Sequence, residues 1–293
     1  MMKLGIGAVA KNEGPYLLEW LAWYLIAGFD KIVVAERGST DATRTILEKL
    51  SQHVPQIEVR DQVFTEAGAH PSQKDTYRDM LKADFGGFDW VAFFDLDEFL
   101  LCPRLDVKGY LDELPEDAGA VLTFWNWFGS NGETTYRPRP VIERFDKRAG
   151  RGFCRTAVGK CIVKPAGLRK MHLHTADTRN GFFMYDGSLE KIESETYQVE
   201  DLKAWAKKFR PAEEAYCRGF LSLNHYALKS AEEFAWKKDR GYIYNPGHDE
   251  ANPAISDSYF KHGDKNVVTD ERAKKFLPAV RDTIIELHRL LNL

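Results

Sequence analysis

The stretch Asp89-Trp-Val-Ala-Phe-Phe-Asp-Leu-Asp-Glu-Phe-Leu100 indicates the fold class of this chain. Residues 90–94 are mostly large and apolar, which predicts a strand that is buried on both faces of a sheet. Three carboxylates follow at once. Because carboxylates are rare inside a buried sheet, we expect them where the strand leaves it. In open α/β sheets, ligands bind at that edge, outside the carboxyl ends of the strands.

The spacing of the two aspartates indicates the kind of ligand. Side chains alternate along an extended chain, so Asp95 and Asp97 are expected to point the same way. Two carboxylates directed at one point suit a hard divalent cation, and sites of the Mg²⁺ type use one or two carboxylates together with substrate phosphates. The stretch therefore predicts a site for a metal ion and a diphosphate. The pattern D-x-D is common by chance, and its position after an apolar strand gives it weight.

Two more polar clusters follow predicted strands nearer the N-terminus. Strands are predicted over residues 4–9, 32–35 and, more weakly, 57–59, with helical patterns between them. Strands that alternate with helices predict a mainly parallel sheet with helices on both faces. The carboxyl ends of parallel strands meet at one rim. The side chains expected on that rim are Lys11, Asn12, Glu13, Glu36, Asp95 and Asp97.

Further candidates come from this rim and from predicted helix starts near it. The Glu36 carboxylate can accept a hydrogen bond from a nucleobase or a ribose, or it can be a solvated turn residue. Ser39 or Thr40 is predicted to cap a helix, and amides at a helix start attract anions. Gln73 and Lys74 open the helix before the acidic strand. Lys74 is either a phosphate contact or an ordinary surface cation.

The second half of the chain contributes aromatic residues and histidines. Strands are predicted over residues 120–124 and 160–164, and residues 125–132 form an aromatic, glycine-rich loop. Trp127 and Phe128 are either core residues or a mobile platform on which the apolar face of an acceptor sugar stacks.

Of the three candidate histidines, His225 has the sequence context that best fits a functional role. His225 follows the strand-like Leu221-Ser-Leu223 and precedes a capping box formed by Ser230 and Glu233. Imidazole joined to carboxylates suits a transition metal such as Mn²⁺. His172 and His174 alternate along a predicted strand, so at most one of them faces the site.

Composition narrows the class of protein. The chain has 293 residues, of which 44% are hydrophobic and 13% aromatic, enough for one compact unit with a substantial core. The formal net charge of −3 gives no indication of nonspecific nucleic-acid binding, which needs clustered positive charge. Four scattered cysteines indicate free thiols. No apolar run is long enough to span a bilayer, so we expect a cytoplasmic enzyme, with contact at a membrane surface left open. The oligomeric state stays open too.

Taken in order, these residues resemble the family-2-like glycosyltransferases with a GT-A fold, and in particular the group related to family 92. The resemblance rests on Lys11-Asn-Glu13, the aromatic helix Tyr16 to Tyr24, Gly38-Ser-Thr-Asp-Ala-Thr43, Gln73, Trp90 to Phe99, Phe128-Gly-Ser130, Lys160-Cys-Ile-Val163, His172 and His225-Tyr-Ala-Leu-Lys-Ser230. It implies a GT-A domain over residues 1–241, with a nucleotide-sugar half (1–124) and an acceptor half (125–241). Residues 242–293 are then a helical extension packed on the same domain.

The resemblance also implies an activity and roles for individual residues. The donor is a nucleotide-sugar, a UDP-sugar first and UDP-galactose by analogy, and transfer is inverting and uses Mn²⁺ or Mg²⁺. The acceptor is a glycan or glycolipid of a cell-surface polysaccharide pathway. The residues implied to bind the nucleotide-sugar are Lys11, Asn12, Glu13, Glu36, Gln73, Lys74 and Asp95. Those implied for the metal ion are Asp95, Asp97 and His225. The residues expected to bind the acceptor are His172 and, from the aromatic loop described above, Trp127 and Phe128.

Two points depart from the family pattern. Glu36-Arg37 stands where an Asp-Asn or Asn-Asp pair is usual, which leaves the choice of nucleobase open. The usual acid–base motif is not found, so the catalytic base stays unknown. Its candidates are Glu133, Glu143, Asp146, Asp177 and Asp186.

Two other functions remain open at this point. A phosphatase with an aspartyl nucleophile also places D-x-D after a strand, but its pattern has Thr or Val where this chain has Phe99, and it uses the first strand. The chain could also bind a nucleotide-sugar without turnover, but the two carboxylates and the candidate base would then have no catalytic role.

Overall fold

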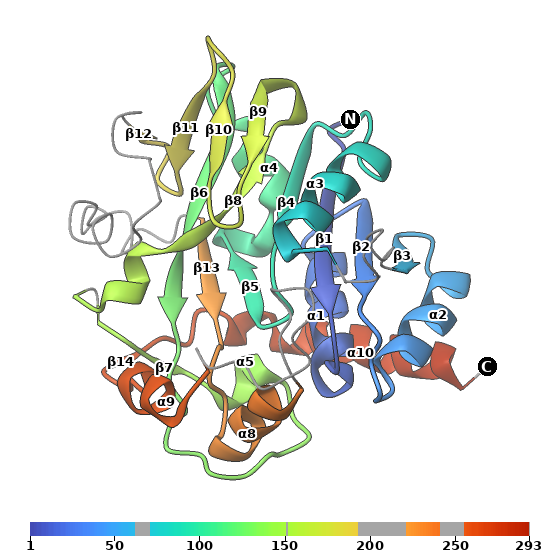
Figure 1. Cartoon of the computed structure of the whole chain (residues 1–293), viewed down its shortest axis with the longest axis vertical. Coiled ribbons are helices and arrows are strands. Elements are labelled where there is room, and N and C mark those ends of the chain that lie inside the picture. Colours follow the sequence, from blue (N-terminus) through green and yellow to red (C-terminus); the bar gives the residue numbers. More distant parts are fainter. Residues whose placement is uncertain (62–70, 151, 193–220, 241–254, 293) are drawn as a thin grey trace.

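The computed structural model describes residues 1–61, 71–150, 152–192, 221–240 and 255–292. At its centre lies a mixed sheet (Figure 1), in which four parallel strands follow the order β3-β2-β1-β4. These strands are β1 (Leu4–Ala10), β2 (Lys31–Glu36), β3 (Ile57–Asp61) and β4 (Trp90–Phe93). All four were predicted from the sequence, and the mainly parallel α/β fold class is confirmed. Their carboxyl ends form the rim that the sequence predicts.

The second half extends the same sheet. Strand β8 (Gly159–Val163) lies antiparallel between β4 and β6 (Ala118–Trp127), and β6 pairs in parallel with β11 (Phe183–Asp186) and β13 (Ser222–His225). The shorter strands are β5 (Glu98–Leu101), β7 (Lys147–Arg148), β9 (Leu168–Met171), β10 (Ala176–Thr178), β12 (Lys191–Ile192) and β14 (Val268–Thr269). Strand β6 continues through Trp127, so the prediction that residues 125–127 belong to a loop is wrong. This stretch pairs with β13.

Helices cover both faces of the sheet (Figure 1). They are α1 (Gly14–Ile26), α2 (Thr43–His53), α3 (Gln73–Ala83), α4 (Val107–Asp112), α5 (Val141–Arg144), α8 (Ala231–Asp239), α9 (Asp257–Gly263) and α10 (Leu277–Leu291). One core lies between α1 and the face of β1 that carries Ile6 and Ala8, and a second lies under α3. Gly7 allows the close approach of α3, because a Cβ there would lie 2.9 Å from the Met80 methyl carbon. None of the described helices has the length and apolar composition needed to cross a bilayer.

The aromatic residues of α1 fix the acidic turn. The Trp20 indole donates a hydrogen bond to the Asp95 carbonyl (3.0 Å), and the Trp23 indole donates to the Leu100 carbonyl (2.9 Å). The Tyr24 hydroxyl donates to the Glu98 carbonyl at 2.9 Å. Because Trp and Tyr need a partner for their polar atoms when they are buried, α1 is tied to the backbone on both sides of the turn. Helix α10 packs in turn on α1 and α2.

One helix start differs from the prediction. Helix α2 begins at Thr43, not directly after Ser39 or Thr40, and neither of these side chains caps it. The Ser39 hydroxyl instead accepts a hydrogen bond from the Asn12 amide at 2.9 Å. The Asp41 carboxylate accepts one from the Thr43 amide at 2.9 Å. Cys102, Cys154 and Cys161 are free thiols as predicted, and Cys217 lies outside the described residues.

Candidate functional site

The ends of β1 and β2 are joined into one rim. Ala10 lies opposite Glu36 in the parallel register. The Asn12 side-chain oxygen accepts a hydrogen bond from the Thr40 amide at 2.7 Å, and the Thr43 hydroxyl accepts one from the Glu13 amide at 2.8 Å. Two of the sequence-predicted clusters are therefore brought together by contacts between their loops.

Glu36 holds the turn that follows β2. Its side chain is 2% exposed, and its carboxylate accepts hydrogen bonds from the Ser39 amide (2.6 Å) and the Gly38 amide (3.2 Å). Gly38 has a φ of 64°, a conformation that glycine adopts without strain. Arg44 lies 3.3 Å from the same carboxylate. In this conformation Glu36 fixes the shape of the rim by binding the backbone amides of its own turn.

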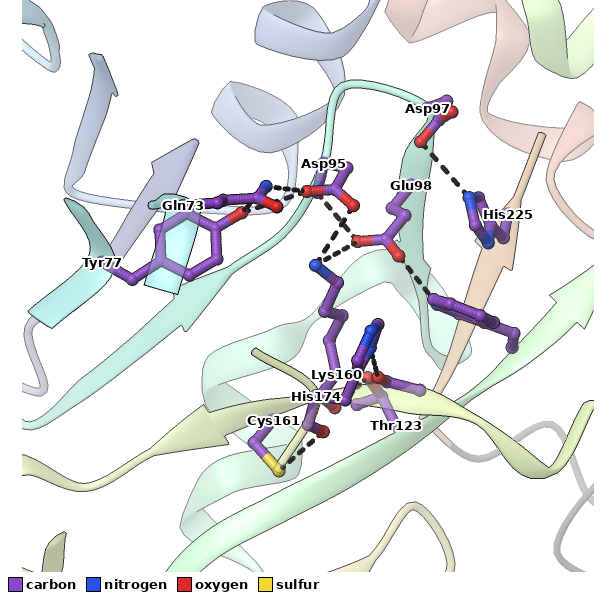
Figure 2. Close-up of polar contacts among 12 residues, drawn as sticks. Gln73, Tyr77, Asp95, Asp97, Glu98, Thr123, Lys160, Cys161, His174 and His225 are labelled. Atoms are coloured by element: carbon purple, nitrogen blue, oxygen red, sulfur yellow. Dashed lines mark hydrogen bonds and ion pairs between the residues drawn. The ribbon is translucent and has the colours of Figure 1, made fainter. Parts of the chain in front are cut away.

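The D-x-D motif lies in a tight turn between β4 and β5. The Glu98 amide donates to the Asp95 carbonyl at 3.0 Å and closes the turn. The chain is therefore not extended here, and the prediction that Asp95 and Asp97 point the same way is wrong (Figure 2). The Asp95 carboxylate accepts hydrogen bonds from Gln73 (2.6 Å) and the Tyr77 hydroxyl (3.0 Å). The second oxygen lies 3.1 Å from the Lys160 ammonium.

Asp97 faces a different set of partners. One of its oxygens lies 3.4 Å from His225 Nε2, and the other accepts a hydrogen bond from Lys237 at 2.6 Å. Burial alone raises the pKa of Asp97, but Lys237 and His225 outweigh it and hold that pKa well below its usual range. Burial lowers the pKa of His225 against the opposing effect of Asp97. Asp97 is therefore an ionised carboxylate beside a neutral imidazole.

Glu98 and Lys160 complete a buried network that sequence reasoning did not assign. Glu98 accepts hydrogen bonds from the Asp95 amide (2.8 Å) and the Trp125 indole (2.7 Å), and burial raises its pKa well above the usual range. Lys160 enters from β8, is 1% exposed and lies between Asp95 and Glu98 (Figure 2). The sequence does contain a signal for this pair. Lys160 begins an apolar run in a predicted strand, and a lysine that is buried there needs a carboxylate partner for its ammonium.

A cavity of about 390 Å³ opens beside Lys237, whose ammonium binds Asp97, although Asp97 and His225 do not themselves line it. The rim residues Asn12 and Glu13 line one side of it, and residues of α8 and of the segment before it line the other. The cations in its wall are Lys229, Lys237 and Arg240. Arg240 pairs with Glu13, and the Lys229 ammonium lies 4.1 Å from the centre of the Tyr16 ring. Cations beside a rim of carboxylates suit an anionic ligand and its counter-ion.

Several predicted residues lie elsewhere. Trp127 and Phe128 are 0% and 1% exposed, and the Trp127 indole donates to the Gly263 carbonyl at 2.8 Å. The residues predicted as a possible mobile aromatic platform are therefore core residues, because β6 extends through Trp127. His172 pairs with Asp177 at 3.2 Å, whereas His174 lies near the acidic network and its Nδ1 donates a hydrogen bond to the Gly159 carbonyl at 3.0 Å. Lys11 and Lys74 are half-buried.

The five candidate bases do not line the cavity beside Lys237. Asp146 pairs with Lys274, and Asp186 accepts amides of its own turn. Glu143 pairs with Arg281, and Glu133 lies 3.6 Å from Arg144.

Trp236 is an aromatic residue that the sequence did not single out. It lies on α8, lines the cavity and is 40% exposed. Its ring lies 5.1 Å from the ring of Tyr136, measured between centroids. Its neighbour Lys237 also lines the cavity and contacts Asp97, so one cavity wall carries both an exposed aromatic ring and the partner of the acidic turn.

The predicted metal shell is only partly assembled. Among the residues that the structure describes, no group of three His, Cys, Asp or Glu side chains is placed to hold a metal ion. Asp97 and His225 do converge, and His225 Nδ1 is buried without a partner among these residues. Asp95 is bound to Gln73, Tyr77 and Lys160 instead. An ionised carboxylate and a neutral imidazole fit a divalent transition metal whose other ligands are substrate oxygens.

Comparison with known proteins identifies the class of enzyme as a glycosyltransferase. The family model for glycosyltransferase family 92 matches residues 11–216, and the chain belongs to that family. The predicted resemblance is confirmed. The match includes the acidic turn and ends before His225 and α8. No curated protein matches the chain.

Two solved structures are similar over part of the chain. One is glucosyl-3-phosphoglycerate synthase from Mycobacterium tuberculosis in complex with Mn²⁺, UDP and phosphoglyceric acid, with 20% identity and a TM-score of 0.30 over 42% of this chain and 43% of that one. The other is the mannosyltransferase PcManGT from Pyrobaculum calidifontis in complex with GDP-Man and Mn²⁺, with 17% identity and a TM-score of 0.35 over 55% and 44%. The matched part spans less than half the length of either protein.

Proposed function

We propose that this glycosyltransferase moves a sugar from a nucleoside diphosphate sugar, a UDP-sugar first, to a glycan or glycolipid acceptor. Transfer depends on a divalent metal ion and inverts the anomeric carbon. The observation that carries the proposal is the pair formed by Asp97 and His225, which is joined through Lys237 to a cavity whose wall also carries Lys229 and Arg240. An ionised carboxylate, a neutral imidazole and cations in one place match the needs of a metal-bound diphosphate.

Asp97 and His225 are the proposed protein ligands of the metal ion. Because imidazole suits transition metals, Mn²⁺ is favoured over Mg²⁺. When it is bound, the metal ion supplies Lewis-acid stabilisation of the leaving phosphates, worth several kcal/mol. The role of Asp97 is to supply a negative charge that burial has not neutralised. His225 supplies a neutral ring nitrogen.

The nucleotide is proposed to lie along the rim. Asn12 and Glu13 line the cavity, with Lys11 beside them, and Glu36 fixes the turn that faces them. Asp95 is the proposed ribose contact, and Gln73 holds its carboxylate in place. Lys74 remains a proposed phosphate contact at the start of α3.

The acceptor is proposed to approach over Trp236 and Tyr136. A pyranose ring has an apolar face, and a partly exposed indole offers a surface on which it stacks. Trp236 lines the cavity beside Lys237, whereas Trp127 and Phe128 have no accessible ring face. We therefore move the proposed aromatic contact from β6 to α8. His172, at the end of β9, is left as a proposed outer contact.

Thermal unfolding in the presence of nucleotides tests the proposal. The melting temperature is measured with UDP, GDP and CDP, each with and without Mn²⁺. A ligand that binds only the folded state raises apparent stability, by about 2.7 kcal/mol at a hundredfold excess over its Kd. We expect a rise with UDP and Mn²⁺ together that exceeds the sum of the separate effects. Phosphate release from a generic phosphomonoester, with no nucleotide effect, would contradict the proposal and favour a phosphatase.

A further inference from the structure

The ammonium group of Lys237 occupies one side of Asp97. It donates hydrogen bonds to an oxygen of that carboxylate (2.6 Å) and to the Ala227 carbonyl (3.0 Å). The Lys237 side chain is 17% exposed and lines the cavity. The other Asp97 oxygen faces His225. Asp97 is thus held between the residue proposed to share its metal ion and a cation that belongs to the protein.

A bound divalent ion would face Lys237 at short range. A buried carboxylate without a counter-charge is costly, so the ammonium stabilises the protein when no metal ion is bound. A divalent ion on the same carboxylate would lie close to that ammonium, and like charges a few ångströms apart repel each other in a partly buried site. The two cations therefore compete for Asp97.

The side chain of Lys237 has an alternative position. It has a flexible four-carbon stem and three donors, and its side chain lines the cavity proposed to hold the diphosphate. The beginning of α8, by contrast, is fixed. Ser230 and Glu233 form a capping box, and Arg144 binds Glu233 through two hydrogen bonds of 2.8 and 2.6 Å. The Lys237 head group is therefore free to exchange partners while its helix stays in place.

We propose that Lys237 is an exchangeable counter-ion, which holds Asp97 when the site is empty, yields it to the metal ion and then binds the diphosphate of the donor. This inference rests on the proposed function. In the transfer step, the bond between the anomeric carbon and the β-phosphate oxygen breaks and its electron pair stays on that oxygen. The acceptor oxygen forms the new bond, and its proton passes to the base. Lys237 stays protonated throughout and neutralises charge on the leaving group.

Two binding measurements with Lys237→Met test the exchange. Binding of Mn²⁺ alone is followed by the electron paramagnetic resonance signal of the free ion, and binding of UDP is then measured at saturating Mn²⁺. We expect Lys237→Met to bind Mn²⁺ about tenfold more tightly than the wild type, because a competing cation is gone. It should bind UDP about tenfold more weakly, because a phosphate contact is gone. Lys237→Arg keeps the charge and should show less than half of either change on a logarithmic scale.

The neighbouring lysine provides a matched control. Lys238 pairs with Asp257 at 2.7 Å and does not line the cavity. Lys238→Met removes the same charge from the same helix and should change neither affinity. If Lys237→Met does not fold, Lys237→Gln takes its place, with near-ultraviolet circular dichroism as the check on folding.

The other outcomes are distinct. Unchanged Mn²⁺ affinity with weaker UDP binding would mean that Lys237 only contacts phosphate, and weaker Mn²⁺ binding would mean that it shapes the metal site. Either result overturns the exchange and leaves the proposed function standing. If the wild type binds neither Mn²⁺ nor UDP, the proposed function fails, and the exchange fails with it.

Discussion

Asp95 and Asp97 are separated by one residue but have different surroundings. Asp95 is bound by the neutral donors of Gln73 and Tyr77 and by the Lys160 ammonium. Asp97 lies between His225 and Lys237, and Lys237 lines the cavity. The tight turn between β4 and β5 causes this difference, because it directs the two carboxylates to different elements. At the scale of single residues, Asp97 is the aspartate of the motif nearer the cavity, because its partner Lys237 lines the cavity wall.

Substitution of His225 tests the second metal ligand. His225→Ala should raise the Mn²⁺ concentration needed for half-maximal activity by at least tenfold, because a nitrogen ligand is lost. Since burial lowers the pKa of His225, a proton should compete with Mn²⁺ in the wild type only at a lower pH than it does for an ordinary histidine. Activity is titrated with Mn²⁺ over a range of pH values. A large drop in the metal-free melting temperature, with unaltered metal dependence, would show that His225 is a core residue only.

Substitution of Trp236 tests the acceptor surface. Trp236→Ala should raise the acceptor KM about tenfold and leave the donor KM within twofold, because the exposed ring stacks on the acceptor alone. Stability should change little, since the side chain is 40% exposed. Initial rates are measured with each substrate varied in turn. A rise in donor KM with no change for the acceptor would place Trp236 on the nucleotide side.

Sequence patterns predicted residues at strand ends better than residues on helix faces. Asp97 and His225 follow apolar runs, which marks them as groups leaving a sheet. Lys237 and Trp236 lie on α8, where lysines at exposed helix positions are common and carry no signal. Their proximity to Asp97 depends on the packing of α8 against the rim, and no local pattern encodes that.

At the scale of elements, the site depends on contacts between loops and helices. Helix α1 holds the acidic turn through the indoles of Trp20 and Trp23. The turn after β2 is held by Glu36 and faces the loop after β1. Helix α1 and the turn after β2 both act by holding the backbone of the rim. Substitutions in them should therefore alter donor binding, although their side chains do not contact the reacting atoms.

Glu36 tests the role of the turn after β2. Glu36→Ala leaves the Gly38 and Ser39 amides without their acceptor and should cost about 1–3 kcal/mol of stability. The donor KM should rise more than kcat falls, the signature of lost uniform binding. Glu36→Gln keeps an acceptor oxygen and should show a smaller loss of both. Chemical denaturation and donor kinetics measure the two effects. A collapse of kcat at constant KM would assign Glu36 to the chemistry instead.

The four parallel strands could be predicted from the sequence because each is an apolar run flanked by helical patterns. The antiparallel insertion of β8 between β4 and β6 could not, because pairing between strands that are distant in the sequence has no local signal. The continuation of β6 through Trp127 was missed for the same reason. Its partner β13 lies nearly a hundred residues later.

At the scale of the whole molecule, the acidic network joins the two halves of the sheet. Asp95 and Asp97 come after β4, Lys160 comes from β8, and His225 ends β13. His174 lies beside this network, and burial lowers its pKa to about 4. The stability of the whole fold is therefore linked to pH through these buried groups.

The pH dependence of unfolding tests this link. Between pH 6.5 and about 4, His174 binds a proton in the unfolded chain but not in the folded protein, so stability falls as the pH is lowered through this range. The shift is worth at most about 3–4 kcal/mol, and screening around a half-buried ring reduces it to roughly 2. His174→Gln should flatten the decline measured by urea unfolding, whereas the control His172→Gln should not. If the free energy of unfolding declined equally with falling pH in all three proteins, His174 would not be the cause of the decline.

The central claim is that Asp97 holds a metal ion on which nucleotide binding depends, and calorimetric titration of UDP tests it most directly. Wild type and Asp97→Asn are titrated with UDP, each with and without Mn²⁺. The wild type should bind UDP only weakly without Mn²⁺ and at least a hundredfold more tightly with it. Asp97→Asn should keep its fold, lose the effect of Mn²⁺ and show no sugar transfer. Near-normal, Mn²⁺-dependent UDP binding and transfer by Asp97→Asn would contradict the claim.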